Sequence, residues 1–341
     1  MRNKLFFLIP MCVAALAFAP FGDGTEMAQT TAHVPDPDAA EMTVKLSADA
    51  MPLYTKRPDT KAAGDLSYIA GWELTGNNWN FGGFSGLLVS NDEKKLIALS
   101  DKGYWLTASL NITSYVQPLY AGVIRHAGTA NKENKETFYD AESLTEYNGG
   151  FLIGAENNNR LLFTPSVSEP LVLSPLNDLV DLSGLSNNNG IEAMTTTPQG
   201  EIWMFAENSR NAQGNQPAWK IVNGKADKLL FHAPKNFSPT DAAALADGSL
   251  LILMRKYSAL EGVAMKLLHI PRANLEKPIL EGIELAHLTG SEANIDNMEG
   301  LDIVLRPDGS YHIYMMSDDN FNIFQRTILL LFSWQPPQLS Q

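Results

Sequence analysis

Short apolar runs separated by polar turns make up most of the chain. From Leu66 to Trp334 the runs are strand-sized, about five to eight residues, and Gly, Asn, Asp or Pro residues lie between them. No stretch keeps apolar residues at helical spacing over the length of an ordinary helix. The pattern therefore predicts an all-β fold built from short strands.

One layout of polar and apolar positions recurs along this region. A polar residue precedes an apolar strand, a turn follows, and a second apolar strand ends in a polar cluster, as in the copy from Glu142 through the turn 148–150 to Glu156. The copies are roughly 50 residues apart, a period typical of β-propeller blades. Their first polar residues are Ser85, Glu142, Glu192, Asp241 and Glu299. We therefore expect a β-propeller with five blades.

The last copy contains only three good strands, 300–304, 311–316 and 328–334, whereas a propeller blade has four. The strand Tyr68 to Leu74 is left over before the first copy. Pairing this strand with the last blade would close the ring and remove its exposed sheet edges. A sixth, degenerate blade built partly from residues 43–84 remains an alternative.

The first residues have the pattern of a secretory signal. Two basic residues precede the apolar stretch 5–19, which is shorter than the ~20 residues that a membrane-spanning helix needs. We expect residues 1–28 to form a signal peptide, cleaved after Ala19 or Ala28. The mature chain is then expected to be a bacterial periplasmic or secreted protein without a transmembrane segment.

The only cysteine, Cys12, lies inside the expected signal. Disulfides, zinc thiolate sites and a cysteine nucleophile are therefore not expected in the mature chain. Residues 29–64 are polar and rich in Pro and Thr, so we expect a flexible linker there, followed by one propeller domain at 65–336.

The overall charge bears on whether the chain binds nucleic acid. The formal net charge is −13 and no run of Lys or Arg is present, so binding to a nucleic-acid backbone is not expected. Hydrophobic residues make up 45% of the chain and charged residues 18%, which is ample for a packed core.

Hairpin geometry predicts where the polar residues of the repeats meet. In an antiparallel hairpin the end of the second strand returns beside the start of the first, so Glu142 and Glu156 lie at the same end of their blade. The first strands of the blades line the central channel, so these polar ends gather at one mouth of it. Carboxylates without thiols favour hard cations, and we expect Ca²⁺ there. The predicted metal ligands are Glu142, Glu192, Asp241, Glu299 and Asp318.

Other charged residues at the same strand ends suggest a chemistry. Basic residues near a bound cation favour a small anionic or ester substrate. The predicted substrate-binding residues are Lys102, Arg160, Arg210, Arg255 and Arg326. Glu156 and Glu207 are the candidate general bases for the attacking water. Alternatively, these acidic and basic residues cap turns and pair with one another to hold the blades together, Glu299 with Arg326 for example.

Several motifs of the repeats form a specific set. They are Phe84-Ser85-Gly86-Leu87, Asp140-Ala141-Glu142-Ser143-Leu144, Asn189-Gly190-Ile191-Glu192-Ala193 and Asp296-Asn297-Met298-Glu299-Gly300-Leu301. With these motifs the chain resembles the bacterial phytase-like family, described as having esterase-like activity, over roughly residues 65–334. The resemblance implies a propeller and hydrolysis of phosphate or carboxylic esters. A non-catalytic binding or scaffold propeller and a sugar-lactone hydrolase remain alternatives.

Overall fold

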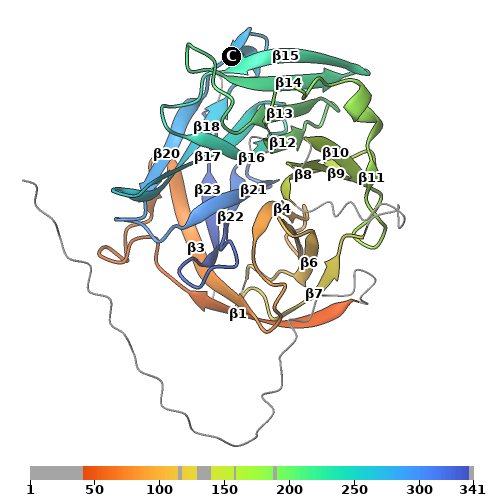
Figure 1. Cartoon of the computed structure of the whole chain (residues 1–341). Coiled ribbons are helices and arrows are strands. Elements are labelled where there is room, and N and C mark those ends of the chain that lie inside the picture. The colour runs from red at the N-terminus through yellow and green to blue at the C-terminus, as the bar shows by residue number, and fades with distance from the viewer. Residues whose placement is uncertain (1–40, 114–116, 129–139, 157–158, 187–189, 338–341) are drawn as a thin grey trace, which may run out of the picture. The chain divides into compact units, whose positions relative to one another are not determined.

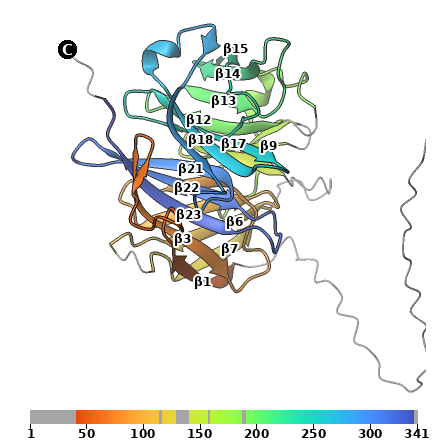
Figure 2. The same ribbon diagram turned by 90° about the vertical axis from the view of Figure 1, so that its left-hand side faces the viewer.

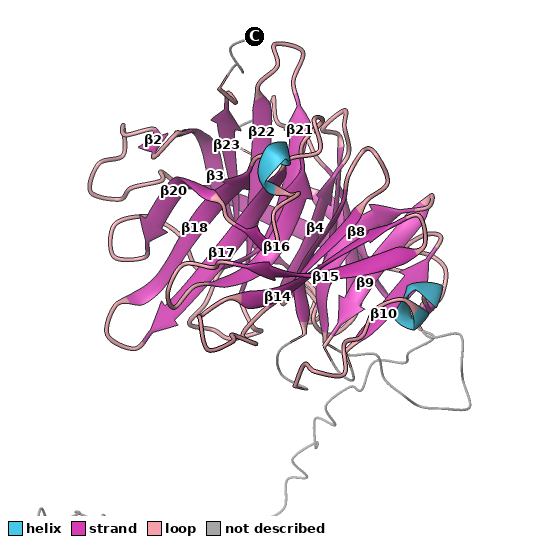
Figure 3. Cartoon of the chain, turned by 90° about the horizontal axis from the view of Figure 1, so that it is seen from above, coloured by secondary structure: helices cyan, strands magenta, loops and turns pink. Residues whose placement is uncertain are grey.

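The computed structural model describes residues 41–113, 117–128, 140–156, 159–186 and 190–337. Almost all of its regular structure is β-strand (Figure 3), and its two helices are the short 3₁₀ turns η1 (Pro175–Asp178) and η2 (Arg272–Asn274). Among these described residues, no helix is long and apolar enough to cross a membrane. The predicted all-β class is confirmed.

Strand pairing arranges most of the strands into groups of four, which we call blades. The first blade contains β4 (Phe84–Val89), β5 (Lys95–Ser100), β6 (Tyr104–Ser109) and β7 (Ala121–His126). The second contains β8 (Ala141–Tyr147), β9 (Gly150–Ala155), β10 (Arg160–Thr164) and β11 (Val172–Leu173). The third contains β12 (Ile191–Thr196), β13 (Ile202–Ala206), β14 (Gln216–Val222) and β15 (Lys225–Phe231), with β19 (Ile279–Leu280) added at its outer edge. The fourth contains β16 (Ser238–Ala244), β17 (Leu250–Ser258), β18 (Gly262–Ile270) and β20 (Ile283–Thr289).

The last blade combines both ends of the domain. It contains β21 (Asn297–Leu305), β22 (Tyr311–Asp318), β23 (Thr327–Trp334) and, from the N-terminal side, β3 (Leu66–Gly76). The antiparallel register places Trp72 opposite Leu329. The predicted closure of the ring by the N-terminal strand is therefore confirmed.

The inner strands of the blades surround one axis. β4 neighbours β8, β8 neighbours β12, β12 neighbours β16, β16 neighbours β21, and β21 returns to β4. Figure 1 looks into this ring of inner strands. The fold is a β-propeller, as the repeats predict.

One strand lies where the sequence suggested only a linker. Within residues 29–64, β1 (Met42–Ala50) pairs with β3 on one side and with β7 on the other, and the short β2 (Ala62–Ala63) also pairs with β3. Figure 2 shows β1 at the outer edge beside both partners. The linker prediction is wrong for this part, because Val44, Leu46 and Ala48 alternate with exposed residues and are buried. The expected signal peptide, 1–28, lies outside the described residues.

The hydrophobic core lies between the blades rather than inside any one of them. Each of the clusters of buried side chains joins residues of two neighbouring blades; Trp72 and Tyr314, for example, share one cluster with the first blade's Leu96. A central strand is consequently buried on both faces, as β13 is throughout. This explains why many strands are continuous apolar runs instead of strict alternations.

A buried carboxylate ties the first blade to the last. Glu93, in the turn between β4 and β5, accepts hydrogen bonds from Tyr314 Oη (2.7 Å) and His312 Nδ1 (2.5 Å) and pairs with Arg306. Burial alone would raise the pKa of Glu93, but the bonds from His312 and Tyr314 and the charge of Arg306 lower it below its ordinary value. The closed ring therefore has a polar contact between its first and last blades in addition to the strand pairing.

Replacement of this carboxylate should weaken the closed ring. We expect Glu93→Ala to lower the free energy of unfolding by about 3–5 kcal/mol, because it removes the buried carboxylate that Tyr314, His312 and Arg306 contact. Lys95→Ala, two positions away at an exposed site, should change the free energy by less than about 0.5 kcal/mol. Urea denaturation of the two variants would measure both values, and equal losses would contradict the role given to Glu93.

Candidate functional site

Each inner strand contains one β-bulge near its N-terminal end. In β8, for example, Ala141 pairs with Ala155 and Ser143 pairs with Gly154, so that Glu142 is the extra residue between them. A bulge turns its extra side chain out of the regular alternation, and bulges are common beside active sites. The bulged residues are Ser85, Glu142, Glu192, Thr240 and Glu299. The repeated polar position in the sequence is therefore the bulge itself.

The fourth blade departs from the sequence alignment by one residue. Its bulged residue is Thr240, and the next residue, Asp241, pairs regularly with Leu253. The buried Asp241 carboxylate accepts hydrogen bonds from Leu301 N (2.7 Å) in the neighbouring blade and from Ala242 N (2.8 Å). The structure therefore does not place Asp241 with the other predicted ligands; it joins β16 to β21.

Five carboxylates from the second and third blades form what we call the carboxylate cluster. Oxygen atoms of Asp140, Glu142 and Glu156 lie within 4.8 Å of one another, and so do oxygen atoms of Glu156, Glu192 and Glu207. Glu156 belongs to both groups and connects them. The predicted general bases and two of the predicted ligands thus lie together in one cluster.

The carboxylate cluster is electrostatically unfavourable when all of its members are ionised. Burial raises the pKa of Glu142 well above its ordinary value, and the charges of Glu192, Glu299 and Asp140 raise it further. Burial and the neighbouring carboxylates, Glu207 first among them, do the same for Glu192. The pKa of Glu156 rises to about 7, mainly through burial and the charge of Asp140. Negative charge is therefore concentrated in a place that water solvates poorly.

The guanidinium of Arg255 lies beside the carboxylate cluster. Arg255 Nη2 lies 3.6 Å from Glu207 Oε1, and Arg255 Nη1 lies 3.3 Å from Glu299 Oε1. Glu299 also accepts a hydrogen bond from Asn297 Nδ2 (2.7 Å). Its basic partner in the structure is Arg255, and not Arg326, the example given for the alternative in which charged pairs hold the blades together. Burial, followed by the charge of Glu299, raises the pKa of the neighbouring Asp318 to about 8.

The other predicted basic residues do not gather around the cluster in the same way. The guanidinium of Arg210 donates hydrogen bonds to backbone carbonyls, among them Gly214 O (2.8 Å) and Pro234 O (3.1 Å). Arg326 lies 3.7 Å from both Glu73 and Asp296. In the structure, Arg210 and Arg326 therefore contact groups outside the carboxylate cluster.

Two basic residues remain near the bulged ends of the strands. Lys102 is exposed, and its Nζ lies 3.1 Å from the centroid of the Phe321 ring. Arg160 begins β10 opposite Ala155, the residue before Glu156. Sequence reasoning overlooked Asp140, although this residue opens one of the motifs and directly precedes β8. Its positive φ of 83° marks a special backbone position.

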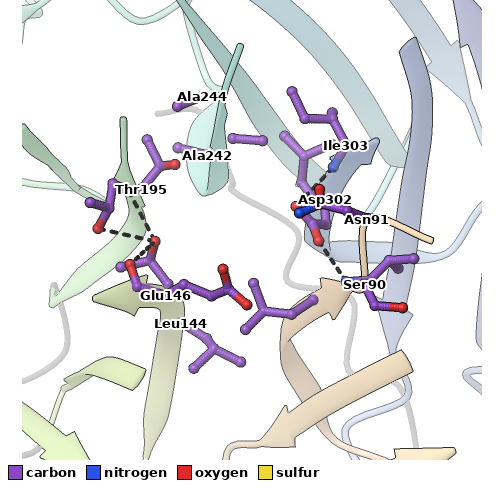
Figure 4. Close-up of a pocket in the computed structure, with 15 residues that line it drawn as sticks. Ser90, Asn91, Leu144, Glu146, Thr195, Ala242, Ala244, Asp302 and Ile303 are labelled. Atoms are coloured by element: carbon purple, nitrogen blue, oxygen red, sulfur yellow. Dashed lines mark hydrogen bonds between the residues drawn. The ribbon is translucent and has the colours of Figure 1, made fainter. Parts of the chain in front are cut away.

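The opposite ends of the inner strands line a pocket whose polar groups mostly serve the fold (Figure 4). Asp302 accepts hydrogen bonds from Val89 N (2.6 Å) and Ile303 N (2.8 Å), and Thr145 Oγ1 accepts one from Thr196 N (3.0 Å). The first and last of these bonds join neighbouring blades. The bulged end, where oxygen atoms of five carboxylates lie close to one another, is therefore the better candidate site.

The raised pKa values predict how the metal-free protein responds to pH. Unfolded carboxyl groups titrate near pH 4, whereas the folded pKa values of Glu156 and Asp318 are about 7 and about 8. The contribution of these two groups to the free energy of unfolding is fully present at low pH. It is lost as the pH rises through their pKa values in the folded protein. In the presence of a chelator, the melting temperature should fall between about pH 5 and pH 8.

The variant Glu156→Gln tests whether Glu156 contributes to this pH dependence of the melting temperature. Glu156→Gln removes one of the titrating groups, so its melting temperature should fall less steeply over the same pH range. Thermal melts followed by circular dichroism would measure both proteins. A melting temperature that rises over this range, or an unchanged slope in the variant, would contradict the assignment.

Comparison with solved structures gives matches at low sequence identity. A protein assigned as a gluconolactonase has 9% identity and a TM-score of 0.38, with 85% of this chain and 100% of that chain covered. The nidogen/laminin complex has 9% identity and a TM-score of 0.40, with coverages of 86% and 94%. The WD40 repeats of RRP9 have 8% identity and a TM-score of 0.38, with coverages of 82% and 84%.

Comparison of the sequence gives a family. No curated protein matches the chain. A family model described as phytase-like, with the esterase-like activity of phytase, matches residues 80–321. The matched span includes every bulged residue and the whole carboxylate cluster, and it covers most of the chain. The chain therefore belongs to the phytase-like family.

Proposed function

We propose that this chain is an exported hydrolase of phosphate or carboxylic esters, and that its carboxylate cluster binds a divalent cation, best Ca²⁺. The observation that supports the cation site is the pair of oxygen groups that share Glu156. Export is inferred from the signal pattern of residues 1–28. N-terminal sequencing of the protein from culture fractions would test cleavage after Ala19 or Ala28.

The donor set of the cluster fits a hard cation. All five members offer carboxylate oxygens, and neither group includes a thiol or an imidazole, which favours Ca²⁺ or Mg²⁺ over zinc or copper. A divalent cation would also offset the repulsion between Glu142, Glu156 and Glu192, which we assign as its main protein ligands. When bound, such a cation supplies Lewis-acid polarisation of an ester oxygen.

The chain's own residues around the cluster have separate roles in this proposal. Glu207 lies at the edge of the cluster, 3.6 Å from Arg255, and we assign it as the general base that takes a proton from the attacking water. Because Glu156 is shared by both oxygen groups, we assign it to cation binding instead. Arg255 orients Glu207 and Glu299, and Lys102 is placed to attract an anionic group of the substrate.

Activity should depend on the cation. The purified protein would be assayed with p-nitrophenyl phosphate, p-nitrophenyl acetate, phytate and gluconolactone, each with Ca²⁺ or with a chelator. We expect turnover of at least one ester, and its loss in the chelator. Turnover that is insensitive to the chelator would contradict the role of the cation. Without turnover of any substrate, the non-catalytic binding or scaffold function would be favoured.

Thermal stability tests the cation site without relying on activity. Ca²⁺ that binds only the folded protein should raise the melting temperature of the wild type. Glu192→Gln should abolish most of this rise while leaving the melting temperature in the chelator equal or higher, because it relieves repulsion.

The matched control is a carboxylate of the same blade with protein partners. Glu201 pairs with Arg272 and lies 3.0 Å from Lys220 Nζ, contacts that lower its pKa to about 2. Glu201→Gln should therefore lower the melting temperature equally with and without Ca²⁺. If Glu192→Gln behaves in the same way as this control, Glu192 is not a ligand.

A further inference from the structure

The most exposed large apolar side chains all lie at the bulged end of the blades. Their exposed fractions exceed those of all other large apolar side chains among the described residues, of which the next are Tyr120 at 58% and Leu173 at 55%. They are Trp79 (97%), Leu260 (94%), Ile323 (91%), Phe324 (87%) and Tyr257 (71%). We call them the apolar tips. Large apolar groups gathered on one face of a folded protein mark an interaction surface.

The apolar tips come from three loops at the bulged end of the blades. The β3–β4 loop ends at Phe84, directly before the bulged Ser85, and the β22–β23 loop begins after Asp318. The β17–β18 turn follows the strand that contains Arg255. The first two loops touch, since Asp319 Oδ1 accepts a hydrogen bond from Gly83 N (2.9 Å).

Each of the three loops holds its tip in a defined turn. In the β3–β4 loop, Asn78 Oδ1 accepts a hydrogen bond from Asn80 N (2.9 Å), on either side of Trp79. In the β22–β23 loop, Asn322 Oδ1 accepts one from Phe324 N (3.1 Å). In the β17–β18 turn, Ser258 Oγ accepts one from Leu260 N (3.3 Å). Side chains that accept from the backbone two residues ahead fix such turns, so the apolar groups are presented on ordered supports.

Charged side chains in these loops are few, and those described next have partners within the protein. Residues 77–83 include no Asp, Glu, Lys or Arg. Asp319 also accepts hydrogen bonds from Phe321 N (3.0 Å) and Thr327 Oγ1 (2.9 Å), and Glu261 pairs with Lys256. Charged groups that already have hydrogen-bond or ion-pair partners cost less to remove from water than unpaired ones do.

We propose that the apolar tips insert into the surface of a zwitterionic lipid bilayer and hold the bulged end of the channel against it. Separate tips on three loops suit a fluid surface, which needs no matching shape, and Trp favours the boundary between lipid and water. The carboxylate cluster lies at the same end of the blades and would repel an anionic surface, which favours a zwitterionic one. This inference does not depend on the proposed ester hydrolysis.

Trp79 provides an internal probe for the experiment. The other five tryptophans, Trp72, Trp105, Trp203, Trp219 and Trp334, are buried. The full chain without its signal would be mixed with phosphatidylcholine vesicles. We expect co-sedimentation, a blue shift of the tryptophan emission, and protection of Trp79 from acrylamide quenching. Wild-type protein that stays in the supernatant would overturn the proposal.

A pair of variants then tests the assigned residues. The double variant Ile323→Ser/Phe324→Ser should bind the vesicles at least about tenfold more weakly, because each large apolar side chain contributes about that factor or more when buried. Leu305→Ser removes a half-exposed apolar side chain at the opposite end of the same blade, and should leave binding unchanged. Equal effects of the two changes would overturn the proposal. So would a shift of Trp79 emission that grows with protein concentration in the absence of vesicles, because it would assign the surface to a second copy of the chain.

Discussion

The antiparallel pairing of β3 with β23 is the interaction on which the rest of the structure depends. It gives the last blade its fourth strand and brings the first and last inner strands, β4 and β21, side by side. Only in a closed ring do the bulged ends of all inner strands face one axis. The convergence of carboxylates is therefore a product of long-range closure, although each bulge is local.

The interactions that stabilise the fold differ from those in the candidate site. Apolar packing between blades and inter-blade bonds such as that of Asp241 to Leu301 N stabilise the ring. The carboxylate cluster opposes it, because buried like charges repel and shift toward their protonated forms. A protein retains such a cluster at a cost in stability, and sites of this kind are where function and stability conflict.

The sequence predicts the architecture better than the details of the site, and the reason is physical. The period, the turns and the missing fourth strand depend on patterns that repeat, so errors in single residues do not matter. Asp241 was placed among the ligands because the order Pro239-Thr240-Asp241 does not show which residue bulges; strand register decides that. Arg210 and Arg255 occupy similar positions in the repeated pattern, and only the folded chain shows that carbonyls surround the first and carboxylates the second. β1 lies outside the repeated pattern, and one of its two partners, β7, is far away along the chain, so the repeats do not predict it.

The position of β1 also has a consequence for how the chain reaches this state. Residues near the two ends of the domain must meet before β3 can complete the last blade, and the entropy of closing so long a segment makes this a late step in folding. Until then the edges of the first and last blades are exposed, and unprotected strand edges invite pairing with other chains. By pairing with both β3 and β7, β1 covers the outer edges of these two blades at once. Once β1 has paired with both strands, neither of these outer edges is open to another chain.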